Sequence, residues 1–191
     1  QVKQEMRRPL IVMTPKSLLR LPAAASTMDE LTDGGFQPVI ADGRELDKSA
    51  VRRITLCSGK VYYDLETARE NDKITDVAVV RLEQFYPFPA AALTEIIASY
   101  EHATELVWTQ EEPQNMGGWT FVEPRLRPIL PQNMSLRYIG RAPSASPATG
   151  SYAIHDLEQH QLVSRSLGEW AEEISPASEP EVSEQIAPAG A

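Results

Sequence analysis

The sequence predicts an α/β fold, a three-layer α/β/α sandwich built on a mainly parallel sheet of about five strands. Short apolar runs rich in β-branched residues recur along the chain, and amphipathic segments with helical spacing separate them. This alternation requires crossover connections, which make neighbouring strands parallel and place helices on both faces of the sheet. No apolar run approaches the ~20 residues that a membrane span needs.

The first expected strand covers residues 9–14, whose continuous apolar run is typical of a strand buried on both faces. A short helix is expected over residues 28–31, because Thr27 can cap it and Glu30 stands at the capping-box offset. Residues 36–40 form the next expected strand. Its Pro38 cannot donate to a ladder, so this strand should lie at an edge of the sheet.

The remaining elements follow in regular alternation. Strands are expected at residues 52–57, 76–82, 105–109 and 135–139, and helices at residues 60–71, 89–100, 120–130 and 152–167. The second of these helices has the clearest pattern, since Leu93, Ile96, Ile97 and Tyr100 fall at i, i+3, i+4 and i+7. The pattern therefore predicts one α/β domain over residues 9–167, preceded by a linker over residues 1–8.

The charge distribution bears on partners and on the end of the chain. The formal net charge of −9 argues against nucleic acid as the main partner. No Lys or Arg follows Arg165, and the Glu-, Pro-, Ala- and Ser-rich residues 168–191 are expected to form a disordered acidic tail. The single cysteine, Cys57, excludes an internal disulfide. It stands at the end of a buried strand, where an inert thiol is expected.

The turn formed by Ser58, Gly59 and Lys60 is a candidate anion site. It joins an expected strand directly to an expected helix, whose first N–H groups and positive dipole end favour an anion. The spacing does not match a P-loop, because Val61 stands where Ser or Thr is required. The alternative is an ordinary strand-to-helix turn with Lys60 in water.

Two further sets of charged residues stand near expected strand ends. Glu111 and Glu112 could serve as an acid and a base, or form a structural pair that caps backbone N–H groups or meets an arginine. Together with Arg141, which precedes a long loop of small residues, they are candidate interface residues. Lys16, Arg20, Arg137 and Arg141 could join Lys60 around one anion. The three histidines lack the spacing and partners of a metal site.

Five motifs occur in an order that resembles the C-terminal domain of the 2-oxoglutarate dehydrogenase first component. They occupy residues 8–20, 57–65, 81–88, 110–119 and 137–148. The resemblance runs from about Arg7 to Leu167 and does not include the tail. It implies a transketolase C-terminal-like α/β/α fold within a thiamine-diphosphate enzyme. Such an enzyme is an oxidoreductase of the tricarboxylic acid cycle, which decarboxylates 2-oxoglutarate and passes the succinyl group onward.

The same resemblance implies what this chain lacks and what it serves. Thiamine diphosphate and Mg²⁺ would be bound by upstream parts of the polypeptide, so this chain alone is expected to be inactive. Its partners would be those upstream domains, a second subunit in a homodimer, and the dihydrolipoyl succinyltransferase component of the multienzyme complex. Its work would be to support the dimer and the active-site rim. An effector of the AMP or acetyl-CoA type is expected near Lys16, Arg20 or Lys60.

One alternative belongs to another class of function. The same fold could be a free-standing regulatory module that binds a nucleotide or another anion. The first residue, Gln1, is not Met, which favours a domain of a thiamine-diphosphate enzyme over a free-standing module. The expected location is the bacterial cytoplasm or the mitochondrial matrix, away from membranes.

Overall fold

A computed structural model describes residue 5 and residues 8–168. Within them, five strands form a single sheet in the order β1-β3-β2-β4-β5. The strands are β1 (Val39–Ile40), β2 (Arg53–Cys57), β3 (Val77–Leu82), β4 (Glu105–Pro113) and β5 (Ser135–Arg141). Only β1 runs antiparallel to its neighbour, and it lies at the edge as predicted. The mainly parallel α/β/α sandwich is confirmed.

The α-helices are α1 (Met28–Thr32), α2 (Val61–Asn71), α3 (Ala90–Ala98), α4 (Trp119–Leu126) and α5 (Tyr152–Leu167), and short 3₁₀ helices are η1 (Lys16–Arg20), η2 (Pro22–Ala24) and η3 (Arg127–Ile129). Thr27 and Glu30 form the predicted capping box at the start of α1. Among the helices described here, none is both long enough and apolar enough to span a membrane.

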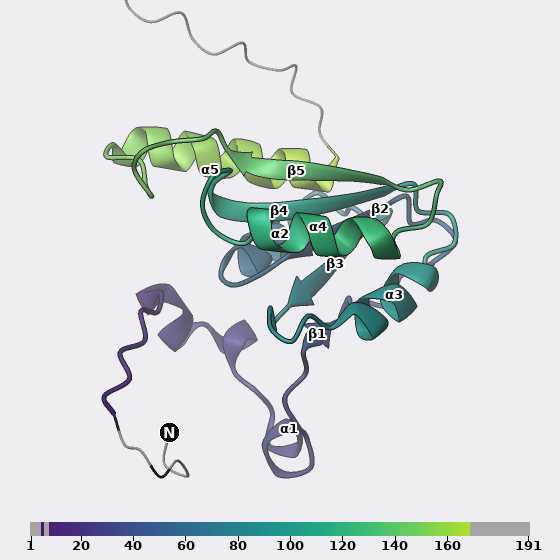
Figure 1. Cartoon of the computed structure of the whole chain (residues 1–191), viewed down its shortest axis with the longest axis horizontal. Helices are drawn as coiled ribbons and strands as arrows, with labels where there is room; N and C mark the ends of the chain where they lie inside the picture. The colour runs from purple at the N-terminus through teal and green to yellow at the C-terminus, as the bar shows by residue number, and fades with distance from the viewer. Residues whose placement is uncertain (1–4, 6–7, 169–191) are drawn as a thin grey trace, which may run out of the picture.

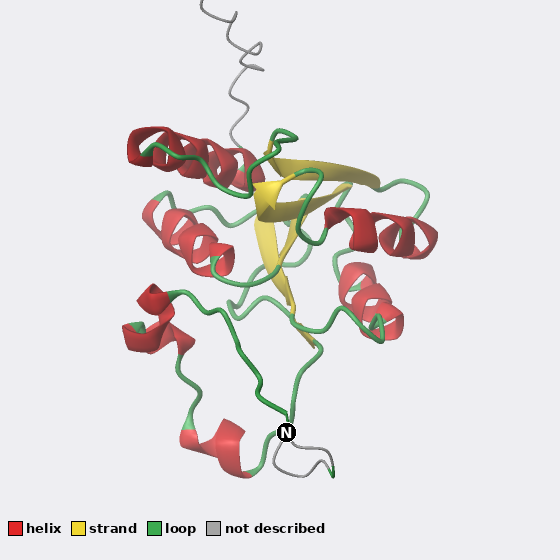
Figure 2. Ribbon diagram, turned by 60° about the vertical axis from the view of Figure 1, so that its left-hand side comes forward, coloured by secondary structure: helices red, strands yellow, loops and turns green. Residues whose placement is uncertain are grey.

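Two apolar cores lie on opposite faces of the sheet, which makes three layers (Figure 2). Helices α3 and α4 pack on one face, and helices α2 and α5 pack on the other. Side chains alternate along a strand, so Ile54 and Leu56 of β2 enter the first core while Cys57 enters the second. Cys57 is fully buried, and this burial raises the pKa of its thiol well above the ordinary value, as expected for a core thiol.

The strand predicted over residues 9–14 is wrong for this sheet. These residues form no strand, and their apolar side chains are exposed. They belong to an arm of residues 8–36 that extends away from the sandwich (Figure 1). None of η1, η2 and α1 contains a buried residue. The apolar pattern was recognised correctly, but nothing in the described chain covers it.

The strand expected over residues 36–40 is shortened to the two residues of β1, Val39 and Ile40, and the other element boundaries changed little. Strand β4 continues through residues 110–113, beyond the predicted end at residue 109, because a register irregularity lets it follow β5 as far as Arg141. Helix α4 ends in η3 within the span predicted as one helix. Gly168 ends α5 with a φ of 114°, a left-handed conformation that glycine adopts readily. The predicted linker lies largely, and the acidic tail almost entirely, outside the described residues.

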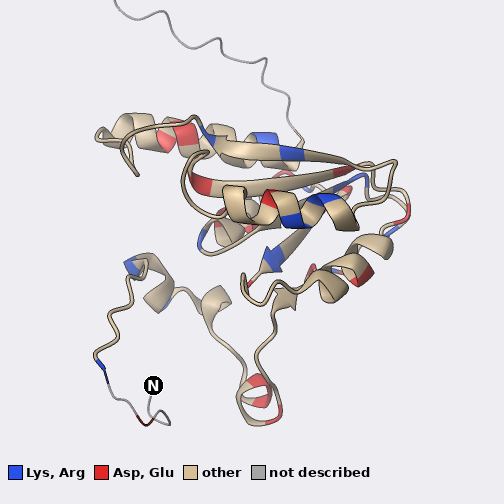
Figure 3. Cartoon of the chain, in the orientation of Figure 1, with Lys and Arg blue, Asp and Glu red and all other residues tan. Residues whose placement is uncertain are grey.

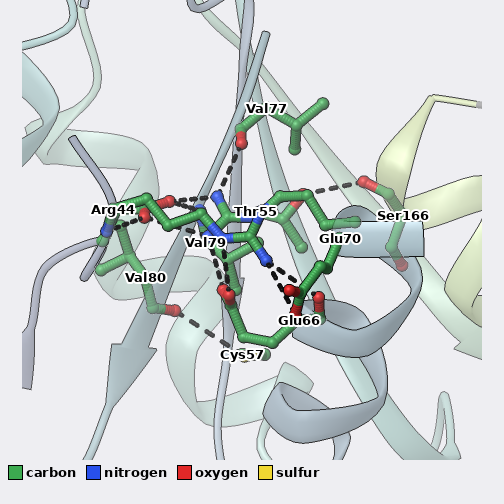
Figure 4. A network of polar contacts seen from close by, with 11 residues as sticks. Arg44, Thr55, Cys57, Glu66, Glu70, Val77, Val79, Val80 and Ser166 are labelled. Carbon is green, nitrogen blue, oxygen red and sulfur yellow. Dashed lines mark hydrogen bonds and ion pairs between the residues drawn. The ribbon is translucent and has the colours of Figure 1, made fainter. Parts of the chain in front are cut away.

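A buried ion network fixes helix α2 to the sheet and to the loop after β1. The Arg69 guanidinium of α2 forms a two-point pair with Asp42 and also donates to Glu66 and to the Val77 carbonyl. Asp42 in turn accepts the Val79 backbone N–H at 2.7 Å. Figure 4 shows the polar contacts of this network, with Glu66 of α2 and Val77 and Val79 of β3 labelled. This network fixes the position of helix α2, which directly follows the Ser58–Lys60 turn.

Candidate functional site

The candidate site is the edge of the sheet at which β2, β4 and β5 end. These three strands are parallel neighbours, so their carboxyl ends lie at one edge. The loops that follow them carry the Ser58–Lys60 turn, the Glu111–Glu112 pair and Arg141. The tertiary fold therefore brings together candidates that stand more than eighty positions apart in the sequence.

Lys60 is paired within the domain. Its Nζ lies 2.8 Å from Glu111 Oε1 and 3.0 Å from Asp64 Oδ2. Burial alone would lower the pKa of Lys60, but the hydrogen bonds and attraction from Glu111 and Asp64 outweigh it, so the pKa is raised. Lys60 therefore stays protonated and cannot act as a neutral base near pH 7. An external anion would have to compete with two carboxylates for it.

The Ser58–Gly59 part of the turn has a local conformational explanation. Gly59 has a φ of 77°, where a side chain would strain the backbone, and a Cβ placed there would meet nothing within 4 Å. The glycine thus serves the turn's geometry and not a close approach of protein atoms. The Gly59 carbonyl accepts the Tyr62 N–H at 3.3 Å in the first turn of the helix.

Arg141 connects the ends of β4 and β5 to α5. Its guanidinium donates to the Glu111 carbonyl, to Glu158 at 2.8 Å and to Gln159 at 3.2 Å. The same group lies 3.2 Å from His155 Nδ1. Its side chain is almost fully buried, so these contacts are made out of water. Arg141 is a structural cross-link between two strand ends and one helix.

The two glutamates have separate environments. Glu111 pairs with Lys60 through its carboxylate and accepts from Arg141 through its carbonyl. Glu112 is exposed, and its carbonyl accepts from Tyr138 at 3.2 Å. The structural interpretation of this pair is thus the one that the contacts favour. The carboxylate of Glu111 meets a lysine, however, and only its backbone carbonyl meets an arginine.

Gln110 organises the loop after β4, and sequence reasoning missed it. Its side-chain carbonyl accepts from the indole of Trp108 at 2.8 Å and from the Trp119 backbone at 2.9 Å. Its amide donates to three backbone carbonyls, those of Glu112, Pro113 and Met116. One buried side-chain amide therefore makes hydrogen bonds to backbone groups at both ends of the loop. The only sequence signal was its place between a buried strand and a Gly-Gly pair.

A second amide joins the two loops that border this edge. Asn115 Nδ2 donates to the Ser144 carbonyl at 2.9 Å, and the Ser144 N–H donates back to Asn115 Oδ1 at 3.0 Å. Beside this clamp lies a pocket of about 490 Å³, lined in part by Arg141, Ser146, Thr149 and Glu158. The small-residue loop thus forms one wall of a pocket and is not a simple linker.

A larger groove of about 540 Å³ lies between α2 and α5. Lys60, Asp64, His155 and His160 are among its lining residues. Gln159 crosses one end of it by donating to Asp64 at 2.8 Å. Among the described residues, no group of three or more His, Cys, Asp or Glu side chains is arranged to hold a metal ion.

The predicted convergence of Lys16, Arg20 and Lys60 is not found in the described chain. Lys16 and Arg20 are exposed on η1 in the arm, whereas Lys60 is partly buried beneath the strand-end loops. Neither arm cation has an ion pair among the described residues. On the sandwich itself, Figure 3 shows both acidic and basic residues on α4 and on α5, so neither helix carries charge of one sign alone.

Comparison with known proteins identifies the family. The family model described as "2-oxoglutarate dehydrogenase C-terminal" matches residues 25–167. The chain belongs to this family. A 2-oxoglutarate dehydrogenase E1 component from Haemophilus influenzae is 47% identical over 167 residues, which cover 87% of this chain and 18% of the relative.

Other relatives agree with that assignment. A 2-oxoglutarate dehydrogenase E1 component from Cupriavidus necator is 47% identical over 163 residues, 85% of this chain and 17% of its own length. An oxoglutarate dehydrogenase from Buchnera aphidicola is 44% identical over 162 residues, 85% of this chain and 18% of its own. The chain thus spans less than a fifth of the curated relatives that it matches. This 2-oxoglutarate dehydrogenase C-terminal domain carries the strand-end edge described above.

Proposed function

We propose that this chain is the C-terminal, non-catalytic domain of a thiamine-diphosphate-dependent 2-oxoglutarate dehydrogenase. The observation that supports the proposal is its 47% identity to a relative named for that activity, over 87% of the chain. The intact enzyme would be an oxidoreductase of the tricarboxylic acid cycle, in a bacterial cytoplasm or a mitochondrial matrix. Thiamine diphosphate and Mg²⁺ would bind to the preceding parts of the polypeptide.

Within that enzyme, the strand-end edge would support the active-site rim and the homodimer. Its two loops are held by internal pairs, Lys60 with Glu111 and Arg141 with Glu158, and by the Asn115–Ser144 clamp. Loops held this way present a defined surface to a neighbouring domain at little further cost in conformational entropy. Glu111, Glu112 and Arg141 remain our proposed interface residues, with the succinyltransferase component as the further partner of the complex.

An anionic effector would bind first through Lys16 and Arg20. These cations are exposed and free of ion pairs in the described chain, whereas Lys60 is held by Glu111 and Asp64. The Ser58–Lys60 turn would join the site only if the effector displaced a carboxylate. This difference in availability also disfavours a free-standing anion-binding module built on Lys60 alone.

The proposal is tested on the full-length polypeptide and on this chain alone. With thiamine diphosphate and Mg²⁺, the full-length protein should decarboxylate 2-oxoglutarate, and the isolated chain should not. Decarboxylation by the isolated chain would refute its non-catalytic role. A full-length protein that prefers another 2-oxo acid would refute the substrate.

The effector part is tested separately. The double variant Lys16→Ala/Arg20→Ala in the full-length enzyme should weaken the response to AMP or acetyl-CoA while the basal rate is kept. Arg127→Ala, which removes a different exposed cation from η3, is the matched control. An unchanged effector response in the double variant would refute the effector proposal and leave the enzyme assignment in place.

A further inference from the structure

The apolar run of residues 9–14 is exposed to an unusual degree for its composition. The exposed fractions are 69% for Leu10, 85% for Ile11, 65% for Val12 and 91% for Met13. Scattered apolar residues on a surface are ordinary, but four in succession are not. The run pairs with no strand among the described residues, so its backbone N–H and C=O groups make no strand-to-strand hydrogen bonds there.

The run also lies outside the unit that the family model recognises. That match begins at residue 25, and the first strand of the described sheet begins at Val39. Pro9 and Pro15 bracket the run, and a proline at each end limits how far a strand ladder can extend. Its sequence therefore specifies one short strand, apolar on both faces.

We infer that residues 9–14 form a strand in a second sheet, which the preceding part of the same polypeptide builds. This inference rests on the proposed function, because it requires a longer polypeptide. Side chains on successive residues point to opposite faces, so a strand apolar at every position needs cover on both faces. Such a position exists in the interior of a sheet flanked by helices, and not at an exposed edge.

The matched relatives are long enough to contain such a sheet. The chain spans 18% of the Haemophilus relative, so most of that protein lies outside the matched part. A second copy of this arm fits the run less well. Two paired runs would make an isolated two-stranded ribbon, which is marginally stable in water and leaves both faces uncovered. We therefore propose that the run pairs with the sheet of the preceding part of the same polypeptide.

The test compares amide hydrogen exchange of residues 10–13 in the full-length protein and in this chain alone. In the full-length protein we expect these amides to exchange about 100-fold more slowly than in the isolated chain, as amides in paired strands do. In addition, Ile11→Asp should lower the melting temperature of the full-length protein and leave that of the isolated chain unchanged. Ile11→Val, which keeps an apolar β-branched side chain, is the control.

Three outcomes would overturn the inference. Fast exchange of residues 10–13 in the full-length protein would show that the run is not in a sheet. Protection that appears in the isolated chain as its concentration rises would assign the run to a second copy. A gene that encodes no preceding segment would remove the proposed sheet. Full-length protein that is active on 2-oxoglutarate but unprotected at the run would refute this inference alone, and protected protein without that activity would refute only the proposed function.

Discussion

Replacing Arg69 with methionine should destabilise this domain more than any surface substitution. The Arg69 and Asp42 side chains are 0% and 1% exposed, and they face each other in a two-point pair. Burial alone would lower the pKa of Arg69, but the hydrogen bond and attraction from Asp42 and then Glu66 raise it. Arg69→Met keeps the apolar stem of the side chain but leaves the Asp42 carboxylate buried without its partner.

The size of the effect follows from that unpaired charge. Breaking a buried pair by removing one partner costs about 3–5 kcal/mol. This is a large share of the roughly 5–15 kcal/mol that stabilises a typical domain. With a urea dependence of about 2 kcal/mol per molar, the unfolding midpoint should fall by roughly 2 M. The matched control is Arg44→Met, a partly exposed partner of Glu66, which should cost less than about 1 kcal/mol.

A double-mutant cycle separates the pair from the packing around it. Asp42→Asn removes the charge that Arg69→Met would strand, so the double variant should be more stable than the sum of the two single losses predicts. We expect a coupling of about 2 kcal/mol from urea unfolding followed by circular dichroism. Additive losses, or a loss below about 1 kcal/mol for Arg69→Met, would refute the claim that this buried pair fixes helix α2.

Three further predictions concern the strand-end edge. Gly140→Ala should lower the unfolding free energy by about 1–3 kcal/mol, because its Cβ would collide with the Tyr138 hydroxyl and crowd the Gln110 carbonyl. Gly43→Ala, which meets open space, is the control, and equal melting temperatures for both variants would contradict the reasoning. Gln110→Ala should speed amide exchange across residues 111–119, because five hydrogen bonds are lost. Replacing the exposed Gln132 with alanine should leave that exchange unchanged. Unchanged exchange in Gln110→Ala would mean that the loop keeps its conformation without this side chain. Burial raises the pKa of Tyr138 from 10.0 to about 12, so its contribution to stability is complete below pH 10 and is lost as the pH rises through about 12. Tyr138→Phe should reduce the dependence of the unfolding free energy on pH in that window. An identical pH dependence in the variant would contradict the shift.

Much of the fold was predictable because its signals are local. The capping box of Thr27 and Glu30 involves positions three apart, and the apolar stripe of Leu93 and Ile97 involves one helix turn. Such patterns act within one element and need no knowledge of its neighbours. The alternation of strands and helices then restricted the architecture to a layered, mainly parallel sheet.

The candidate site was less predictable because its contacts cross elements. The residues Ser58–Lys60, Glu111 and Arg141 were each chosen from positions near strand ends, and the fold does bring them to one edge. Their charges, however, are used against one another: Lys60 meets Glu111, and Arg141 meets Glu158. Which cation meets which carboxylate depends on strand order and register, and neither can be obtained from spacing along the chain.

The sequence by itself determined the layered α/β class, the position of nearly every element and the family resemblance, because hydrophobic periodicity and ordered motifs are properties of neighbouring residues. Only the tertiary structure decided the strand order β1-β3-β2-β4-β5, the burial of Arg69 with Asp42, and the exclusion of residues 9–14 from this sheet. An apolar run requires cover, but its sequence does not say which surface supplies it. That choice depends on the free energy of packing between distant segments, which exists only once they are placed together.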